Sequence, residues 1–428
     1  METVRQLERL RALLAALESA NRFYAPRLAA AGVSAALGDL AEFSARMPFT
    51  TKADLVADQA AHPPFGSNLT EPLPRYTRFC QTSGTTGRPL VILDTPESWD
   101  WLLGNWAHIY RAAEIVPGDR IYFAFSFGPF LGFWTAFEAA AKLGFLCIPG
   151  GGLGTAARLR AIVEQGATVL CCTPTYALHL GEVAVREGLD LRAAAVRKII
   201  VAGEPGGSMP EVRGKISAAW NGARVIDHYG MTEVGPVAFQ PREGILQIIE
   251  ESYFAEIVDP LSGMPMPEGA AGELVLTALG RTASPLLRYR TGDLVQRIPE
   301  AAGFALAGGI LGRADDMIVV RGVNLYPSGV DAVLHGVAEI AEYRVEVSRR
   351  GALVEIEVAI ESADETAAHR AELALASAFS LRIPVRRVEP GTLPRFEMKA
   401  RRWIVCGPEP RDGSPSSAGF NASGSRPG

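Results

Sequence analysis

The chain has 428 residues, of which 48% are hydrophobic and 21% are charged, and its formal net charge is −5. This length predicts more than one domain, and the composition is ordinary for a globular protein in water. No block of basic residues indicates a nucleic acid or an anionic membrane surface as a partner.

The N-terminal stretch is expected to form an amphipathic helix, because apolar residues recur there at helical spacing: Val4, Leu7, Leu10, Leu14 and Leu17. Charged residues interrupt this stretch too often for a secretory signal. The most apolar later stretch, 123–152, contains Glu138, Lys142 and several glycines, so we expect no membrane span. A cytoplasmic location follows by elimination.

The five cysteines are odd in number and show no C-x-x-C spacing, which argues against a disulfide framework and against zinc. Two of them lie in the apolar run "TVLCCTP", which is typical of a buried strand.

Between about residues 75 and 312, short apolar runs such as "DRIYFAF" and "RKIIVAG" alternate with helical stretches such as "AARLRAIVEQG". This alternation predicts an α/β fold, with mostly parallel sheets flanked by helices. The period-two runs "FAEIVDP" and "GELVLTAL" predict a small antiparallel addition.

The pattern then changes to helices, a hairpin-like pair and a last strand, which predicts a small mobile α+β domain. We therefore expect a large N-terminal domain over 1–312 and a C-terminal lid domain over 313–407. The Gly/Ser/Pro-rich tail 408–428 is expected to be disordered.

The segment "TSGTTG" at 82–87 combines four hydroxyl side chains with two glycines. Glycines let backbone N–H groups approach an anion, and the hydroxyls add donors, so phosphate is a natural guest. The spacing does not match the P-loop of kinases and GTPases, and a flexible surface loop is the competing interpretation.

Further strings follow in order: "DHYGMTE" at 227–233, "YRTGD" at 289–293, "GRADDMIVVRGVNLYP" at 312–327 and "LPRFEMKARR" around Lys399. Together with "SGTTG", they resemble the landmarks of the adenylate-forming superfamily of acyl-CoA synthetases, peptide-synthetase adenylation domains and luciferases. "AGEP" at 202–205, "FAEIVDPLSG" and the segment 125–132 are similar to the phenylacetate–CoA ligase branch. The resemblance covers almost the whole chain except the tail.

The resemblance implies an ATP-dependent carboxylate–CoA ligase. A carboxylate attacks the α-phosphorus of ATP to give an acyl-adenylate and pyrophosphate, and CoA then displaces AMP. The expected cofactors and co-substrates are ATP, Mg²⁺ and CoA. Similar proteins are often homodimers.

By position in these motifs, the phosphate cradle would consist of Thr82, Ser83, Gly84, Thr85, Thr86 and Gly87. Glu233 would hold Mg²⁺, Thr232 would donate to the α-phosphate, and Lys399 would bridge the two reacting anions. Tyr229 would stack on adenine and Asp293 would accept the ribose hydroxyls. The other expected ATP or AMP contacts are Gly203, Glu204, Pro205, Asp227, Gly230, Met231 and Arg313.

Each of three charged candidates has a structural alternative. Glu233 would otherwise face a helix N-terminus, and Asp293 would pair with Arg290. Lys399 would otherwise belong to a solvated basic face. Met398 stands where the family usually has glycine, so the loop carrying Lys399 is expected to differ from that of its relatives.

The second half-reaction implies a rotation of the small domain about a few hinge residues. By resemblance, Asp315 or Asp316 is the expected pivot. Arg321 and Gly322 are expected to line the tunnel for the pantetheine arm of CoA.

The acyl pocket is expected beside "FSFGPFLGFW", at 125–134. Its expected lining is Phe127, Phe130, Ala202, Val234, Gly235 and Pro236. Aromatic side chains favour an aryl or arylacetic acid such as phenylacetate, and a small branched or hydroxylated aliphatic acid is the alternative. The aromatic residues have ordinary core packing as their competing interpretation.

Two other functions compete with the ligase. One is an adenylating enzyme that loads a carrier protein or an amine. The other is a nucleotide-binding regulatory protein without turnover, against which the presence of Glu233, Asp293 and Lys399 argues.

Overall fold

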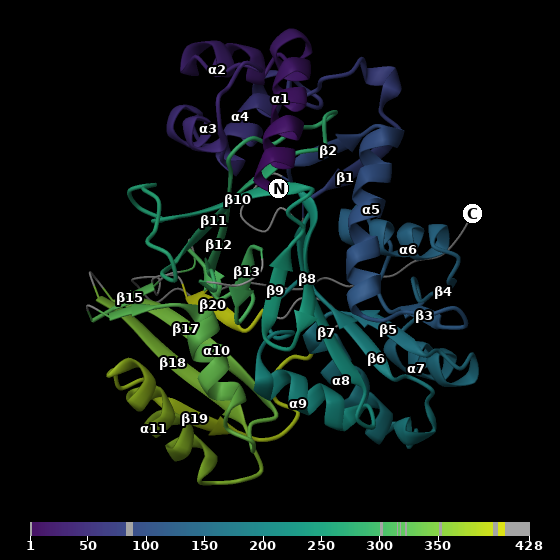
Figure 1. Cartoon of the computed structure of the whole chain (residues 1–428). Helices are drawn as coiled ribbons and strands as arrows, with labels where there is room; N and C mark the ends of the chain where they lie inside the picture. The colour runs from purple at the N-terminus through teal and green to yellow at the C-terminus, as the bar shows by residue number, and fades with distance from the viewer. Residues whose placement is uncertain are drawn as a thin grey trace, which may run out of the picture.

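The computed structural model describes residues 2–82, 89–299, 303–314, 316, 318–321, 323–350, 353–396 and 401–406. The predicted disorder of the tail 408–428 concerns residues outside these ranges. In Figure 1 the N-terminal helices lie at the top, the large sheet and its helices at the right, and the C-terminal part at the lower left.

The N-terminal layer consists of α1 (Glu2–Ala20), α2 (Tyr24–Ala31), α3 (Leu40–Arg46) and α4 (Lys52–Ala61). The predicted amphipathic helix is α1, whose apolar face is buried at Leu10, Leu14 and Leu17. A capping box begins α4, because Thr51 and Asp54 satisfy each other's backbone N–H groups. This cap makes Lys52 the first residue of the helix.

The large sheet is mixed and runs in the order β13-β9-β8-β7-β6-β5-β3-β4. Its parallel strands are β3 (Arg120–Phe123), β4 (Leu146–Pro149), β5 (Val169–Cys172), β6 (Lys198–Val201) and β7 (Arg224–Met231). Antiparallel strands extend one side: β8 (Gly235–Arg242), β9 (Ile245–Ile248) and β13 (Ala305–Ala307). The predicted α/β class is confirmed.

Helices cover both faces of this sheet, and alternate side chains of β5 enter the two resulting cores. Val169 and Cys171 pack with α5 (Pro96–Ala112) and α6 (Leu131–Lys142). Leu170 and Cys172 pack on the other face with α7 (Thr155–Glu164), α8 (Pro174–Arg186) and α9 (Pro210–Ala219). All four residues of β5 are buried, as expected of a strand covered on both faces.

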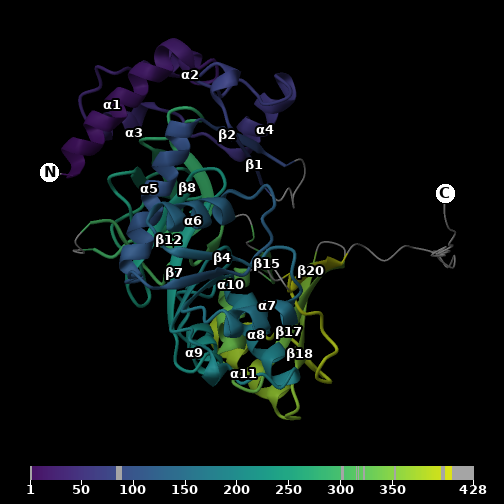
Figure 2. The same cartoon turned by 90° about the vertical axis from the view of Figure 1, so that its right-hand side faces the viewer.

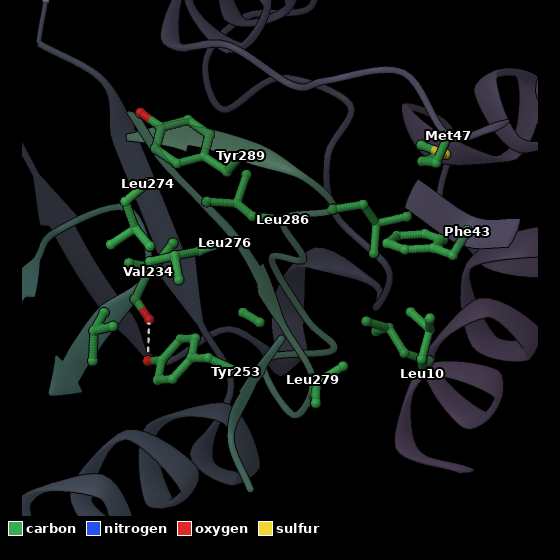
Figure 3. Packing of buried hydrophobic residues seen from close by; sticks show 14 of the residues in the cluster. Leu10, Phe43, Met47, Val234, Tyr253, Leu274, Leu276, Leu279, Leu286 and Tyr289 are labelled. Carbon is green, nitrogen blue, oxygen red and sulfur yellow. Dashed lines mark hydrogen bonds between the residues drawn. The ribbon is translucent and has the colours of Figure 1, made fainter. Parts of the chain in front are cut away.

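A second, antiparallel sheet joins the large sheet to the N-terminal helices. It consists of β10 (Tyr253–Val258), β11 (Ala271–Ala278), β12 (Tyr289–Gln296) and β14 (Gly312–Arg313). Its apolar residues share one core cluster with Leu10 and Phe43 of the helices (Figure 3). The predicted antiparallel portion is confirmed. Residues on both sides of the expected boundary at 312 belong to β14, which pairs with β12. The boundary itself stays a prediction.

Three shorter elements precede α5. The turn η1 (Leu73–Arg75) leads into β1 (Arg78–Gln81), which pairs antiparallel with β2 (Val91–Asp94). A second short turn, η2 (Leu191–Ala193), connects α8 to β6.

The C-terminal part has its own sheet, in the order β19-β18-β17-β20, and its own core. Its elements are β15 (Ile318–Val320), β16 (Val323–Leu325), α10 (Pro327–His335), β17 (Glu342–Arg350), β18 (Leu353–Glu361), α11 (Ala367–Phe379), β19 (Val385–Val388) and β20 (Trp403–Cys406). Figure 2 shows this part and the N-terminal helices at opposite ends of the molecule. Within the described ranges, no helix has both the length and the apolar character that a membrane crossing requires.

Candidate active site

Parallel pairing brings several loops to one edge of the large sheet. Cys172, the last residue of β5, pairs with Val201, the last residue of β6, and Val201 pairs with Asp227 of β7. The segments 124–130 and 202–207 leave β3 and β6 at this same edge. Ligands of open α/β sheets bind at the carboxyl ends of the strands, so this edge is the candidate site.

The motif "DHYGMTE" ends in a tight turn between β7 and β8 rather than at a helix. Met231 pairs with Gly235, and the turn 232–234 joins them. Gly235 has φ +93°, and a Cβ on Gly230 would lie 2.8 Å from the Gly235 carbonyl oxygen, so both positions favour glycine. The helix-terminus alternative for Glu233 is therefore wrong, because this residue lies in a hairpin turn.

Glu233 is buried and lies next to a lysine from a distant part of the chain. The Lys52 Nζ atom is 3.4 Å from Glu233 Oε1, and the lysine side chain remains 42% exposed. Burial first, and then the Glu233 charge, raise the pKa of the neighbouring Tyr289 hydroxyl well above its usual value. Sequence reasoning missed Lys52, because the only local signal is its place at the N-terminus of α4.

Asp293 accepts hydrogen bonds on both carboxylate oxygens. Tyr229 Oη donates to Oδ2 at 2.5 Å, and Arg313 Nη1 donates to Oδ1 at 3.1 Å. Burial raises the pKa of Asp293, and the Arg313 charge opposes this shift. The alternative pairing with Arg290 is wrong, since Arg290 Nε donates to Glu273 at 2.9 Å. An ionised carboxylate has about four lone-pair positions, so Asp293 keeps capacity for ribose hydroxyls.

The Asp227 carboxyl is buried behind the loop that follows β6. Ser208 Oγ donates to Asp227 Oδ2 at 2.5 Å. The Gln240 side-chain oxygen accepts from the Asp227 backbone N–H at 3.2 Å and from Arg213 Nη1 at 2.7 Å. Burial raises the pKa of Asp227 to about 7, while Ser208 and Arg213 oppose the shift. The Asp227 carboxyl therefore already accepts a hydrogen bond from Ser208.

The loop "AGEP" is fastened by its glutamate. Glu204 Oε1 accepts the Thr175 backbone N–H at 2.7 Å, which connects the loop after β6 to the first turn of α8. Gly203 and Pro205 are exposed, and Gly203 has φ +94°. Main-chain groups of this loop are therefore accessible beside the strand ends, as an adenine edge requires.

An aromatic cluster follows β3 beside this edge, and it continues into α6. The Phe125 ring stacks on Phe133 with a centroid separation of 4.2 Å. The Phe127 ring lies 5.0 Å from Trp134 and 5.4 Å from Phe137. Phe127 and Phe130 are half-buried. Phe127 also packs against the core cluster that includes residues of α5 and α6, so core packing stays a competing interpretation for it.

The opposite wall of the predicted pocket differs in part from expectation. Ala202 is half-buried, whereas Gly235 and Pro236 are buried. The Val234 side chain is fully buried in the core cluster of Figure 3, so it offers no surface to a substrate. The turn places Val234 in the same core cluster as Leu274 and Leu276 of β11.

The start of the hydroxyl-rich segment is fixed. Thr82 is buried, its N–H donates to the Leu90 carbonyl at 3.0 Å, and its Oγ1 accepts the Leu90 N–H at 3.0 Å. The Gln81 N–H donates to the Pro129 carbonyl at 2.8 Å, which places the end of β1 beside the segment 124–130.

Several predicted residues lie outside the described ranges: Ser83, Gly84, Thr85, Thr86, Gly87, Asp315, Gly322, Met398 and Lys399. Asp316 and Arg321 are described and exposed, and Arg321 has φ +50° at the turn between β15 and β16.

Known families match both parts of the chain. The model of the AMP-binding enzyme family matches residues 69–280, and that of the AMP-binding enzyme C-terminal domain matches residues 322–405. The phenylacetate-coenzyme A ligase of Pseudomonas putida is 33% identical over 371 residues, with 83% of this chain and 81% of the relative covered.

The chain belongs to the adenylate-forming AMP-binding enzyme family. It is an adenylate-forming acid–CoA ligase, and use of ATP and CoA is typical of AMP-binding acyl-CoA ligases.

Among solved structures, 2-hydroxyisobutyryl-CoA ligase with 2-HIB-AMP in the postadenylation state has a TM-score of 0.87 at 30% identity, covering 94% of this chain and 89% of the other. The same ligase with CoA in the thioesterification state has a TM-score of 0.70 at 31% identity and equal coverage. The described arrangement of this AMP-binding enzyme is therefore more similar to the postadenylation state than to the thioesterification state of that ligase.

Asp227→Asn is expected to change how stability depends on pH. The raised pKa means that the folded state favours the neutral carboxyl of Asp227. The contribution of this group to the free energy of unfolding is therefore fully present below about pH 4 and is lost as pH rises through about 7. Across that interval the free energy of unfolding of Asp227→Asn should rise relative to that of wild type, by on the order of a few kcal/mol. Urea unfolding at several pH values measures this gain.

Asp190→Asn is the control for that experiment, because Arg192 hydrogen bonds lower the pKa of the exposed Asp190. This variant should show no such gain with rising pH. A constant difference between Asp227→Asn and wild type from pH 4 to pH 8 would contradict the buried-carboxyl account.

Proposed function

We propose that this chain is a CoA ligase for an aryl or arylacetic acid such as phenylacetate. The observation that carries the proposal is the half-buried aromatic cluster at the carboxyl end of β3, beside the candidate nucleotide site. Flat apolar acids gain from burial against such rings. The phenylacetate-coenzyme A ligase relative is consistent with this substrate class.

A small hydroxylated aliphatic acid is the second candidate. It is favoured by the similarity to 2-hydroxyisobutyryl-CoA ligase, which extends over 94% of this chain. The aromatic cluster argues for the aryl acid, because a small branched acid would contact few of its rings.

The nucleotide would lie along the edge of the sheet, with its ribose at Asp293 and its phosphates towards the turn 232–234. Tyr229 and Arg313 orient the Asp293 carboxylate. We assign catalytic contact to Thr232 and Glu233 in this turn, together with Lys399. A bound nucleotide would leave its triphosphate near the Lys52 ammonium, which already faces Glu233.

The residues present fit Mg²⁺ supplied together with ATP. The described residues contain no group of three or more side chains suited to holding a metal alone. Glu233 offers one buried carboxylate, and Mg²⁺ typically bridges one or two carboxylates and substrate phosphates. When bound there, the ion would neutralise phosphate charge.

We also propose that the C-terminal part works as a lid that carries Lys399 to the acid. An ion pair fastens it to the large sheet's helices, with Arg395 Nε 3.1 Å from Glu182 Oε2. Arg395 precedes Lys399 by four residues in the sequence, so this contact ties the chain to α8 shortly before the lysine. The higher similarity to the postadenylation state supports an arrangement of the C-terminal part like that of a ligase holding its acyl-adenylate.

A pyrophosphate-release assay over a panel of carboxylic acids tests the substrate. With ATP and Mg²⁺, phenylacetate should support faster release than 2-hydroxyisobutyrate, and CoA should increase turnover. Phe127→Ala should raise KM for phenylacetate by about tenfold, because it removes apolar contact worth about 1–2 kcal/mol. Phe79→Ala, at an exposed ring outside the cluster, is the control.

Release that favours 2-hydroxyisobutyrate would replace the aryl acid with the second candidate. Release that ignores CoA would instead favour a carrier protein or an amine as the acceptor.

Lys399→Ala is expected to abolish adenylation but leave thioester formation from a preformed acyl-adenylate nearly unchanged, because the lysine bridges anions only in the first half-reaction. Single-turnover assays of each half-reaction measure this. Lys142→Ala, which removes an exposed ammonium paired with Asp100, should affect neither. Equal loss in both half-reactions would refute the assigned role.

Lys52→Met should raise KM for ATP·Mg by about tenfold or more, since a hydrogen bond to a charged group contributes about 1.5–3 kcal/mol. AMP affinity should stay near that of wild type, because the lysine faces the phosphate tail. Competition binding with ATP and AMP separates the two effects, and Lys142→Met is the matched control. An unchanged KM would remove Lys52 from the site.

A further inference from the structure

A fully buried arginine, Arg281, donates hydrogen bonds to the backbone of the turn 232–234. Arg281 lies in the loop after β11, and its side chain and that of Asp94 are both 0% exposed. Arg281 Nε donates to Asp94 Oδ1 at 2.8 Å, and Nη2 donates to Asp94 Oδ2 at 2.5 Å. Nη1 donates to the carbonyl oxygens of Glu233 at 2.7 Å and Thr232 at 3.3 Å.

Stability alone does not account for this pair. Withdrawing two charges from water costs several kcal/mol per ion, and replacing a buried ion pair by apolar residues is often neutral or stabilising. The guanidinium uses a planar fork on Asp94 and still has donors for two carbonyls, which neither lysine nor an apolar residue can reproduce. What the Arg281 guanidinium contributes, and other side chains cannot, is to fix the direction of the peptide groups in the turn 232–234.

The same contact reaches the strand that leaves the hydroxyl-rich segment. Asp94 is the last residue of β2, and the segment between β1 and β2 contains residues 83–88. The loop that carries Arg281 is also fastened to β2, because Ser284 Oγ donates to the Leu93 carbonyl at 2.5 Å. Arg281 thus connects the turn 232–234 to β2, the strand that follows the hydroxyl-rich segment in the sequence.

A second donor completes the support of the turn. Tyr253 Oη donates to the Val234 carbonyl at 2.8 Å, as the dashed line in Figure 3 shows. The carbonyls of residues 232, 233 and 234 therefore all point inward to fixed donors. Fixing these peptide planes sets the directions in which the Thr232 and Glu233 side chains leave the turn.

We propose that Arg281 and Asp94 are positioning residues that orient the turn 232–234 towards the triphosphate end of ATP. This inference rests on the proposed function, which assigns that turn to the phosphates. Neither residue touches the nucleotide. Their effect should concern ATP·Mg and not AMP, because AMP would be held mainly by Asp293 and its partners.

The test replaces both charges at once, so that no lone charge is left in the core. Asp94→Leu/Arg281→Met should fold with an unfolding midpoint close to that of wild type. Its calorimetric Kd for ATP·Mg should rise about tenfold to a hundredfold, as outer-shell substitutions do at ligand sites. Its Kd for AMP should change less than twofold.

A matched control is the pair Arg288 and Glu256, which is also bidentate and has side-chain exposures of only 8% and 12%. Its N···O distances are 2.9 and 3.0 Å, and Arg288 Nη1 donates to the Met47 carbonyl at 2.6 Å, away from the turn. Glu256→Leu/Arg288→Met should leave the ratio of ATP·Mg to AMP affinity unchanged. An equal loss of ATP·Mg affinity in both double variants would overturn the inference.

A double-mutant cycle with Glu233→Gln shows whether the pair acts through the turn. If it does, the cost of Asp94→Leu/Arg281→Met in ATP·Mg affinity should shrink in the Glu233→Gln background. Full additivity would overturn the inference. Unchanged ATP·Mg binding in Glu233→Gln itself would instead refute the proposed role of Glu233, so the two failures are distinguishable.

Discussion

Parallel pairing of β3, β5, β6 and β7 brings their carboxyl ends to one edge of the sheet, and the candidate site is built from the loops that leave there. The pairing requires helical crossovers, which cover both faces and bury the strands. The loops are consequently the polar, accessible ends of an otherwise apolar layer. The position of the candidate site at this edge is the consequence of the strand order.

The acidic groups at this edge are each held by a partner from elsewhere in the chain. Asp293 of β12 is bonded by Tyr229 of β7 and by Arg313 of β14, and Glu233 faces Lys52 of α4. The N-terminal helices and the antiparallel sheet therefore complete a site whose base is the large sheet. Their shared core cluster fixes these partners in place (Figure 3).

Buried charge is treated in two ways around the site. The Asp227 carboxyl has a pKa raised to about 7, because burial dominates over its hydroxyl and arginine neighbours. The Asp94 carboxylate instead receives both bonds of a guanidinium fork. The first arrangement makes a group that titrates near neutrality, and the second makes a fixed support for the turn.

Much of the architecture was predictable from the sequence, because periodicity is local. The apolar run of β5, the alternation of β10 and β11, and the amphipathic α1 all follow from neighbouring residues. The motifs likewise indicated Glu233 and Asp293 as candidates, through their resemblance to the adenylate-forming superfamily.

Tertiary structure decided which distant side chains meet. Lys52 faces Glu233 and Arg281 forks onto Asp94 only because helices and sheets separated by long stretches of sequence pack together. The same packing turned Val234 into the core and gave Arg313, rather than Arg290, to Asp293. The sequence by itself determined the elements and the chemistry of the motifs, because these depend on neighbours along the chain. Which residues pair with a buried charge depends on how the core is assembled, because the two partners lie far apart in the sequence and no local pattern relates them.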